Sequence, residues 1–143
     1  MSEANESGEA ISVSKESGGV FVARNGRGGV IRLATAGDLD TWTPTELLRA
    51  ALAGCAALSL EPLMERHLGE DAEATVTVSG QYDCAQRRYD SFSTSVFIAG
   101  ENLDARQRVR VEQSAHRVLR SACRVERTLT RTPRLDLDVQ VEP

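Results

Sequence analysis

The sequence predicts an α+β protein with a mostly antiparallel sheet, a buried central helix and a second, amphipathic helix. Three observations support this prediction: short alternating apolar runs between glycine-rich turns, one long uncharged run of alanine and leucine, and a later run with helical spacing. The length of 143 residues fits one domain. We expect residues 1–9 to form a flexible polar tail and residues 10–143 to form that domain.

Three short apolar runs open the chain and predict a meander of antiparallel strands. The first contains Ile11 and Val13, which alternate with serines, and the others lie at 20–22 and 30–33. Glycine-rich segments at 17–19 and 24–29 separate them, as in hairpins with tight turns.

The next segment predicts a long helix from Thr43 to Leu68. Thr43 is a suitable N-cap, and Glu46 stands three residues later, which is the spacing of a capping box. Residues 50–60 carry no charge on any side, so we expect this helix to be buried all round, partly against another subunit. The run is too short to span a bilayer. Pro62 should kink or break the helix.

The second half predicts a hairpin, a helix and a last strand. Residues 74–79 and 92–98 alternate between apolar and polar, as strands with one buried face do. Residues 105–122 carry a single apolar stripe with helical spacing, and Asp104 with Gln107 forms a capping box at the start of this helix, with Asp104 as N-cap. Residues 135–141 alternate between apolar and polar, which predicts a strand.

Composition and the first residues limit the function and the location of the protein. The net charge is −4 and aromatic residues make up 4% of the chain, which argues against nucleic-acid binding. The acidic first residues do not resemble a signal peptide, so we expect a cytoplasmic protein without a membrane anchor. In that compartment the three cysteines do not form a structural disulfide framework.

The cysteines allow two interpretations. Cys55 lies within the apolar run and Cys123 ends the second helix, where a free cysteine is often only a small packing residue. A reactive thiol is the alternative. A metal site is not expected, because His67 and His116 stand at no ligand spacing from a cysteine. Cys84 lies in a polar turn and is interpreted as an incidental exposed thiol.

Two segments around these cysteines resemble one family. Residues 44–55, PTELLRAALAGC, resemble the P-x-E-L-L-x-x-A-L-x-x-C signature of the OsmC/Ohr family of osmotically inducible and organic hydroperoxide resistance proteins. Residues 123–129, CRVERTL, resemble that family's C-P-V-S-x-x-L signature. The resemblance spans roughly residues 11–141 and implies the OsmC-like fold and an intertwined homodimer.

The resemblance also implies a thiol-dependent peroxidase that needs no cofactor or metal. By position, Cys55 is similar to the attacking cysteine and Cys123 to the resolving cysteine, and an external dithiol recycles the disulfide. The family holds its reactive thiolate with an arginine in an early turn, and Arg24 is the nearest match, with Arg27 and Arg32 as neighbours. Apolar walls would favour organic hydroperoxides over hydrogen peroxide.

This chain departs from the family pattern beside both cysteines. Thr45 stands where family peroxidases carry a glutamate after the proline, and Glu46 is better explained as the capping residue. Arg124 and Glu126 replace a proline and a serine in the second signature. The departure at Thr45 motivates a second hypothesis, a binding module of the same fold for a small apolar or thiol-reactive ligand, with little peroxidase activity.

Overall fold

The computed structural model describes residues 10–36, 38 and 40–143, and the expected tail at 1–9 lies outside them. The chain divides into two compact units between Leu48 and Arg49. One domain over residues 10–143 therefore stays a prediction.

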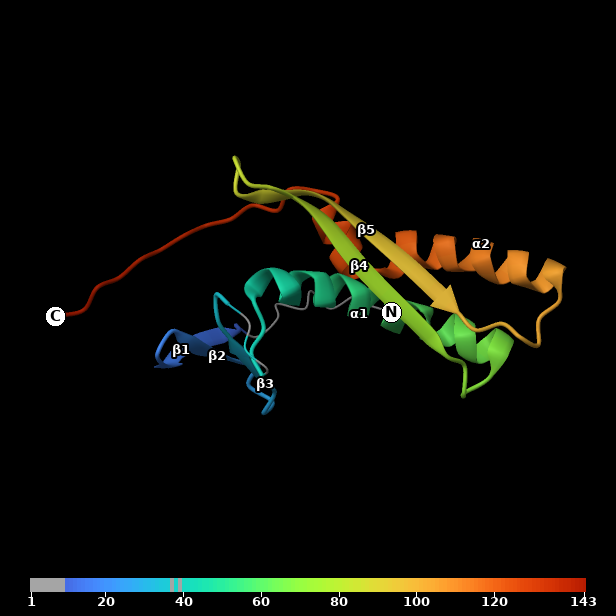
Figure 1. Cartoon of the computed structure of the whole chain (residues 1–143), viewed down its shortest axis with the longest axis horizontal. Coiled ribbons are helices and arrows are strands. Elements are labelled where there is room, and N and C mark those ends of the chain that lie inside the picture. Colours follow the sequence, from blue (N-terminus) through green and yellow to red (C-terminus); the bar gives the residue numbers. More distant parts are fainter. Residues whose placement is uncertain (1–9, 37, 39) are drawn as a thin grey trace, which may run out of the picture. The chain divides into compact units, whose positions relative to one another are not determined.

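The first unit is built on a three-stranded antiparallel meander (Figure 1). Strands β1 (Ser12–Ser17), β2 (Val20–Arg24) and β3 (Val30–Leu33) pair in the order β1-β2-β3. Gly18 and Gly19 join β1 to β2 with φ of 51° and 85°, a left-handed conformation that glycine adopts without a steric penalty. The predicted meander is confirmed.

Helix α1 (Pro44–Leu68) begins with the predicted capping box. The hydroxyl of Thr43 accepts the backbone N–H of Glu46 at 3.3 Å, and the Glu46 carboxylate accepts the backbone N–H of Thr43 at 3.0 Å. The helix continues through Pro62 to Leu68, so Pro62 does not break it, and the alternative of a kink stays a prediction. Leu60 and Leu63 flank the proline and are both buried, and their packing offsets the lost helical hydrogen bond.

The second unit combines a long hairpin with two helices besides α1. Strands β4 (Ala74–Asp83) and β5 (Arg88–Ile98) pair antiparallel, followed by α2 (Ala105–Ala122) and a short α3 (Arg124–Leu129). Asp83 accepts two backbone N–H groups of the hairpin turn, from Ala85 and Gln86. Asp104 and Gln107 form the predicted capping box of α2.

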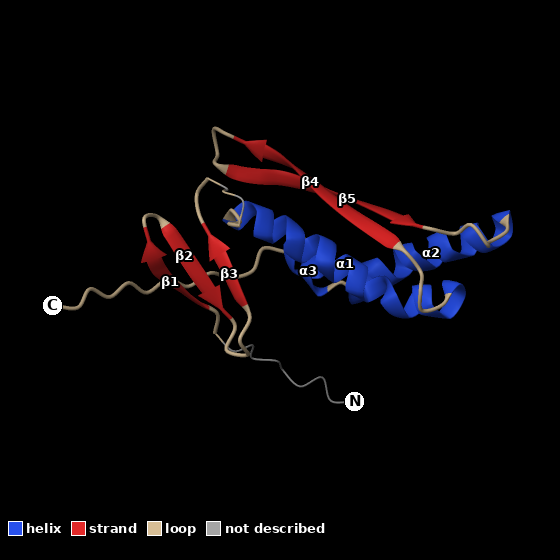
Figure 2. Cartoon of the chain, turned by 60° about the horizontal axis from the view of Figure 1, so that its bottom comes forward, coloured by secondary structure: helices blue, strands red, loops and turns tan. Residues whose placement is uncertain are grey.

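The core of this unit lies where α1, α2 and the hairpin meet (Figure 2). Leu60 and Leu63 from α1 pack with Ala115 from α2. Val96 of β5 packs against this cluster from the hairpin, and Val118 and Leu119 pack against it from α2. This packing fixes α1 against α2, and with it the two cysteines that these helices carry.

Burial of α1 within the single chain is one-sided, and the predicted cover of its other sides by another subunit stays a prediction. The buried residues follow one stripe, namely Leu52, Ala56, Leu60, Leu63 and Met64. Leu58, on another side, is 76% exposed, because the hairpin and α2 cover a single face. By length and composition α1 could cross a membrane, a test that core helices of soluble proteins also pass.

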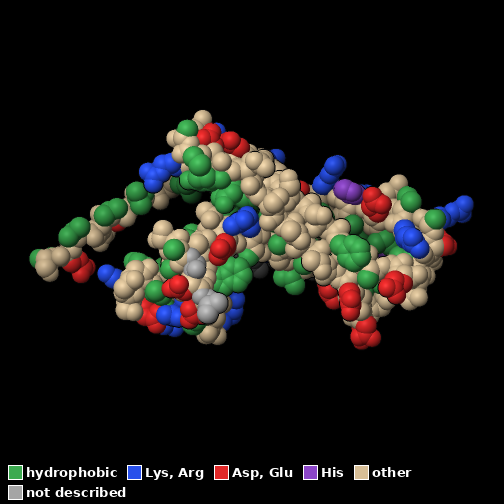
Figure 3. Space-filling model, in the orientation of Figure 1, with side chains coloured by type: hydrophobic (Ala, Val, Ile, Leu, Met, Phe, Trp, Pro, Cys, Tyr) green, Lys and Arg blue, Asp and Glu red, His purple; other side chains and the backbone are tan. Residues whose placement is uncertain are grey.

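The predicted strand at 135–141 is also wrong for this chain. Residues 132–143 are extended but belong to neither sheet. The side chains of Leu135, Leu137, Val139 and Val141 are 75–92% exposed, and Figure 3 shows hydrophobic side chains along this segment. Alternation gives a segment two faces, but a strand also needs a neighbour to pair with, and the described chain supplies none here.

Candidate dithiol site

The structure brings Cys55 and Cys123 together. Cys55 lies in the middle of α1 and is half-buried, whereas Cys123 joins α2 to α3 and is 0% exposed. The two thiols lie near enough that each shifts the pKa of the other. Two cysteines that are distant in the sequence therefore form a contact pair inside the second unit.

Four hydrogen-bond donors surround the sulfur of Cys55. Burial raises the pKa of this thiol, but hydrogen bonds from the backbone N–H of Val125, the thiol of Cys123, the backbone N–H of Arg124 and the hydroxyl of Ser59 together lower it below the ordinary value. Each of these bonds is stronger to a thiolate than to a thiol. Cys55 is thus the sulfur of the pair that ionises first.

Two of these donors are available because of how α3 begins. Arg124 and Val125 occupy its first turn, where backbone N–H groups have no intrahelical acceptor. Cys123 is the N-cap residue, and its side chain makes no conventional cap hydrogen bond. The break between α2 and α3 therefore turns free backbone donors toward the Cys55 sulfur.

The pKa of Cys123 is shifted in the opposite direction. Burial raises its pKa most strongly, the backbone N–H of Glu126 lowers it, and the hydrogen bond to Cys55 and the negative charges of Cys55 and Glu126 raise it. The net effect is a pKa above the ordinary value. The contact pair therefore favours one arrangement, with a thiolate at Cys55 and a proton on Cys123.

Ser59 lies one helical turn after Cys55 on α1. Its hydroxyl donates to the backbone carbonyl of Cys55 at 2.7 Å and is also within hydrogen-bonding reach of the Cys55 sulfur. Residues four apart in a helix share a face, which explains the contact. The hydroxyl has a single proton, so it can serve either the carbonyl or the sulfur at one time.

The arginines of the predicted site belong to the first unit, and both cysteines belong to the second. Arg24 ends β2 and is exposed. Arg32 forms ion pairs with two carboxylates: its Nε lies 3.1 Å from Glu16, and its Nη1 is bonded to Asp40. An arginine beside Cys55 stays a prediction, for Arg24 as for its neighbours.

Thr45 and Glu46 lie at the start of α1. Glu46 is engaged in the capping box, as expected. The Thr45 hydroxyl lies 3.4 Å from the hydroxyl of Thr43. At this end of the helix, the Glu46 carboxylate accepts a hydrogen bond from the backbone.

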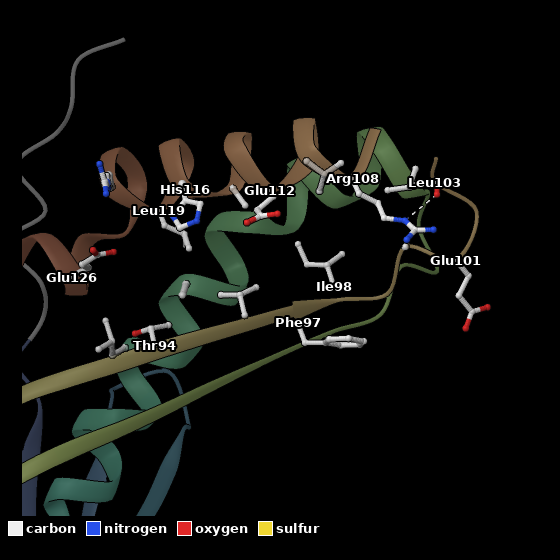
Figure 4. Close-up of a pocket in the computed structure, with 17 residues that line it drawn as sticks. Thr94, Phe97, Ile98, Glu101, Leu103, Arg108, Glu112, His116, Leu119 and Glu126 are labelled. Atoms are coloured by element: carbon white, nitrogen blue, oxygen red, sulfur yellow. Dashed lines mark hydrogen bonds between the residues drawn. The ribbon is translucent and has the colours of Figure 1, made fainter. Parts of the chain in front are cut away.

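A cavity of about 850 Å³ lies between α1, α2 and the hairpin, and neither Cys55 nor Cys123 is among the residues that line it (Figure 4). Its lining includes Ala56, which follows Cys55, and Glu126, whose backbone N–H faces the sulfur of Cys123. Apolar side chains of α2 and β5 form much of the wall, and at the far end Arg108 donates to the carbonyl of Leu103 at 3.0 Å. The cavity could hold an apolar ligand against α1 at Ala56, the residue after Cys55.

The third cysteine, Cys84, does not belong to this pair. Cys84 is exposed in the turn between β4 and β5, as the sequence predicted. In the part of the chain that the structure describes, no group of three or more His, Cys, Asp or Glu side chains could hold a metal ion.

Ser59 and the first turn of α3 were missed by sequence reasoning. Ser59 could have been found as the polar residue one turn beyond Cys55 in an otherwise apolar run. The donors of α3 are backbone groups of a six-residue helix, and no side-chain pattern marks such groups.

Comparison with known proteins places this chain in a family. The family described as OsmC-like protein matches residues 37–138. An uncharacterised protein of Mycobacterium tuberculosis is 32% identical over 120 residues, covering 83% of this chain and 87% of the relative.

Solved structures agree with this match at the level of the fold. The OsmC-like protein from Mycoplasma pneumoniae aligns with a TM-score of 0.66 and 14% identity, over 86% of this chain and 87% of that chain. The organic hydroperoxide resistance protein OhrB of Bacillus subtilis aligns with a TM-score of 0.53 and 20% identity, over 87% and 92%. With its α+β fold and both cysteine signatures, the chain belongs to the family of OsmC-like proteins.

Proposed function

We propose that this protein is a thiol-dependent peroxidase for organic hydroperoxides, with Cys55 as the attacking sulfur and Cys123 as the resolving one. The observation that supports this most directly is the contact between the two thiols, in which the pKa of Cys55 is lowered and that of Cys123 is raised. Structural neighbours that carry the name hydroperoxide resistance protein fit the same class of reaction.

The proposed reaction runs through a disulfide. The Cys55 thiolate attacks the terminal oxygen of the hydroperoxide, the O–O bond breaks, and the alkoxide that leaves takes the proton of Cys123 to become an alcohol. The Cys123 thiolate then attacks the sulfenic acid at Cys55, so that an S–S bond forms and hydroxide leaves, to be protonated by solvent. An external dithiol reduces the disulfide by exchange.

The cavity between α1, α2 and the hairpin, whose lining includes Ala56 next to Cys55, supports an organic substrate. Leu52, Val96, Val111 and Leu119 are among its apolar lining residues. An alkyl chain would gain by leaving water for such a wall, whereas hydrogen peroxide has no apolar part to bury. We therefore favour hydroperoxides with a substantial apolar group.

The working unit in this proposal is a homodimer. The exposed Leu58 on α1 and the exposed alternating residues of the segment 134–143 are apolar surfaces that a second copy would cover. The extended segment would gain backbone partners by pairing with a strand edge of the other subunit.

A binding module is the second candidate, and Thr45 is the residue that favours it. The family glutamate at this position is absent, and Glu46 is engaged in the capping box. If an activating carboxylate is required, the same cavity would bind its apolar ligand without turning it over.

Consumption of cumene hydroperoxide with dithiothreitol as reductant tests the two candidates. The parent protein should consume the hydroperoxide and, without reductant, form a Cys55–Cys123 disulfide that mass spectrometry detects. Cys55→Ser should abolish consumption, and Cys123→Ser should leave a sulfenic acid at Cys55 that dimedone traps. Cys84→Ser, at the exposed hairpin turn, is the matched control. Equal consumption by Cys55→Ser and the parent would refute the peroxidase, and binding without turnover would support the module.

A further inference from the structure

The outward side of helix α2 carries three arginines in a row. Arg106, Arg110 and Arg117 stand at i, i+4 and i+11, a spacing that places them on one side of an α-helix. All three are exposed, whereas Val111 and Ala115 on the core-facing side are buried. From the rise per residue of an α-helix, this arginine face extends over about 16 Å along the helix axis.

The arginine face has no carboxylate of its own. Glu112, the one acidic residue within α2, lines the cavity on another side of the helix, together with Arg108 and His116 (Figure 4). Within the described residues, none of the three arginines forms an ion pair with a carboxylate, and Arg117 donates to the hydroxyl of Ser114 at 3.0 Å. The positive charge of this face is therefore not neutralised by the described part of the chain.

These charges lower the stability of α2. Arg106 and Arg108 lie in the first turn, which holds no acidic residue, and the positive end of the helix dipole repels cations there. Arg106 and Arg110 are also four residues apart, where like charges on a helix surface repel each other. Residues that oppose the stability of their own helix are typical of a functional surface. This arrangement therefore indicates that the arginine face binds a partner.

The distribution of charge along the sequence argues against nucleic acid as that partner. Residues 105–134 contain nine arginines and two glutamates, whereas the rest of the chain holds 19 acidic residues and eight basic ones. A long polyanion such as double-stranded DNA extends past the arginine face and would be repelled by the acidic remainder of the chain. A smaller acidic partner avoids this repulsion.

The residues around the arginines argue against a membrane. Gln113 and Ser114 are polar, and Val118 and Leu119 pack against the core of the second unit. Val109 is exposed, but one valine gives a bilayer little apolar surface to bury. Arginine, in contrast, matches a carboxylate with two parallel hydrogen bonds. Carboxylates of a protein therefore fit this face better than a lipid surface does.

We propose that the arginine face of α2 is a docking surface for an acidic segment of a partner protein, with carboxylates repeated along one side at a matching spacing. A face of this size gives a small interface, and small interfaces belong to complexes that form and dissociate rapidly. Attraction between opposite charges would speed the encounter. The proposal involves neither Cys55 nor Cys123, so it is independent of the proposed function.

Binding of a labelled helical peptide to the full chain, measured by fluorescence anisotropy, tests this proposal. The matched peptide is alanine-based with glutamates at i, i+4 and i+11, and the comparison peptide has the same composition with its glutamates spread round the helix. The parent should bind the matched peptide several-fold more tightly, and its affinity should fall as salt is added. Arg110→Gln with Arg117→Gln should weaken this binding several-fold. Arg87→Gln with Arg88→Gln, at the exposed end of the hairpin, removes the same charge and should bind as the parent does.

Arg106→Glu distinguishes recognition from a folding defect. A glutamate in the first turn of α2 interacts favourably with the helix dipole and stands four residues before Arg110, so the thermal midpoint followed by circular dichroism should rise. Binding of the matched peptide should nevertheless weaken, because the glutamate repels its carboxylates. A damaged fold would instead lower both quantities.

Several results would overturn the proposal. No binding of the matched peptide, or equal affinity for both peptides, would exclude recognition of spaced carboxylates. An equal loss in the hairpin control would show that net charge alone is responsible. Tighter binding of phosphatidylglycerol vesicles or of a double-stranded DNA through the same arginines would assign the face to a membrane or to nucleic acid. Hydroperoxide consumption plays no part in these measurements, so the proposed function is tested separately.

Discussion

Cys55 in α1 and Cys123 at the junction of α2 and α3 lie near enough that each thiol shifts the pKa of the other. The contact is asymmetric, since Cys123 is 0% exposed while Cys55 is half-buried and receives backbone donors from α3. This asymmetry gives the two sulfurs different chemistry before any substrate arrives.

The first prediction concerns the pH dependence of Cys55. Its pKa is lowered, so the thiolate is present above that lowered value and is lost as the pH falls through it. The rate of alkylation of Cys55 should therefore rise to a plateau with a midpoint below that of a free thiol, about 8.5. Cys123→Ala removes one of the donors and should move the midpoint upward.

Thiolate absorbance measured against pH on the reduced protein gives an independent readout for this prediction. The Cys84→Ser background removes the exposed thiol from the signal. A midpoint at or above that of a free thiol in this background would contradict the assignment of Cys55 as the ionised sulfur.

The second prediction is that Ser59→Ala raises the pKa of Cys55. The substitution removes a hydroxyl that lies within reach of the sulfur as well as of the Cys55 carbonyl, and with it one of the groups that lower the pKa of Cys55. The matched control is Ser121→Ala on α2, because Ser121 makes the same bond to a carbonyl one turn earlier, 2.9 Å from the carbonyl oxygen of Arg117.

Helix stability should change similarly in these two variants, but the midpoint of Cys55 titration should move only in Ser59→Ala. An equal shift in both variants, or in neither, would remove Ser59 from the thiolate environment. Ser59→Thr, which keeps the hydroxyl, should retain the parent midpoint.

Local features of this fold could be predicted from the sequence, because their contacts span three or four residues. Both capping boxes, Thr43 with Glu46 and Asp104 with Gln107, formed as expected. The hairpin and the amphipathic helix α2 follow from periodicity in the same way. The family signature, not periodicity, pointed to the pairing of Cys55 with Cys123, since no local pattern links two distant residues.

The errors share one physical cause, which is that a residue pattern does not specify what will cover it. Alternation at 135–141 predicted a strand, but pairing depends on a neighbour that the described chain does not supply. The apolar residues of α1 predicted burial all round, partly by another subunit; within the single chain the hairpin and α2 cover one face, and the rest of that prediction is untested. Helix α3 was missed because six residues are too few to show a helical period.

The third prediction concerns the capping box of α2. Asp104→Ala removes the acceptor of the Gln107 backbone N–H, whose bond is 2.8 Å long, and should lower the free energy of unfolding by about 1 kcal/mol. Urea denaturation followed by circular dichroism measures this difference. Asp104→Asn keeps a capping oxygen and should lose much less. If alanine and asparagine were equally destabilising, the loss would reflect the charge at this helix end and not the cap.

The last prediction uses substitutions of two leucines of α1 to distinguish effects on folding from effects on self-association. Leu60 is 0% exposed in the core of the second unit, so Leu60→Ala should lower the free energy of unfolding by about 2–5 kcal/mol. Leu58 is 76% exposed in the single chain, so Leu58→Asp should leave the fold of a single copy intact. If a second copy covers this side of α1, as proposed, the aspartate places a charge in that interface and should convert dimer to monomer.

Light scattering coupled to size-exclusion chromatography measures this change, with circular dichroism to confirm the secondary structure. Deletion of residues 134–143 is the companion experiment, because this segment belongs to neither sheet of the single chain and its apolar residues are 75–92% exposed. Each change should weaken association, and Lys15→Ala, on the exposed strand β1, controls for an unrelated surface substitution. A parent protein that elutes as a monomer would refute the proposed dimer. A Leu58→Asp variant and a truncated chain that both remain dimeric would exclude these two surfaces from its interface.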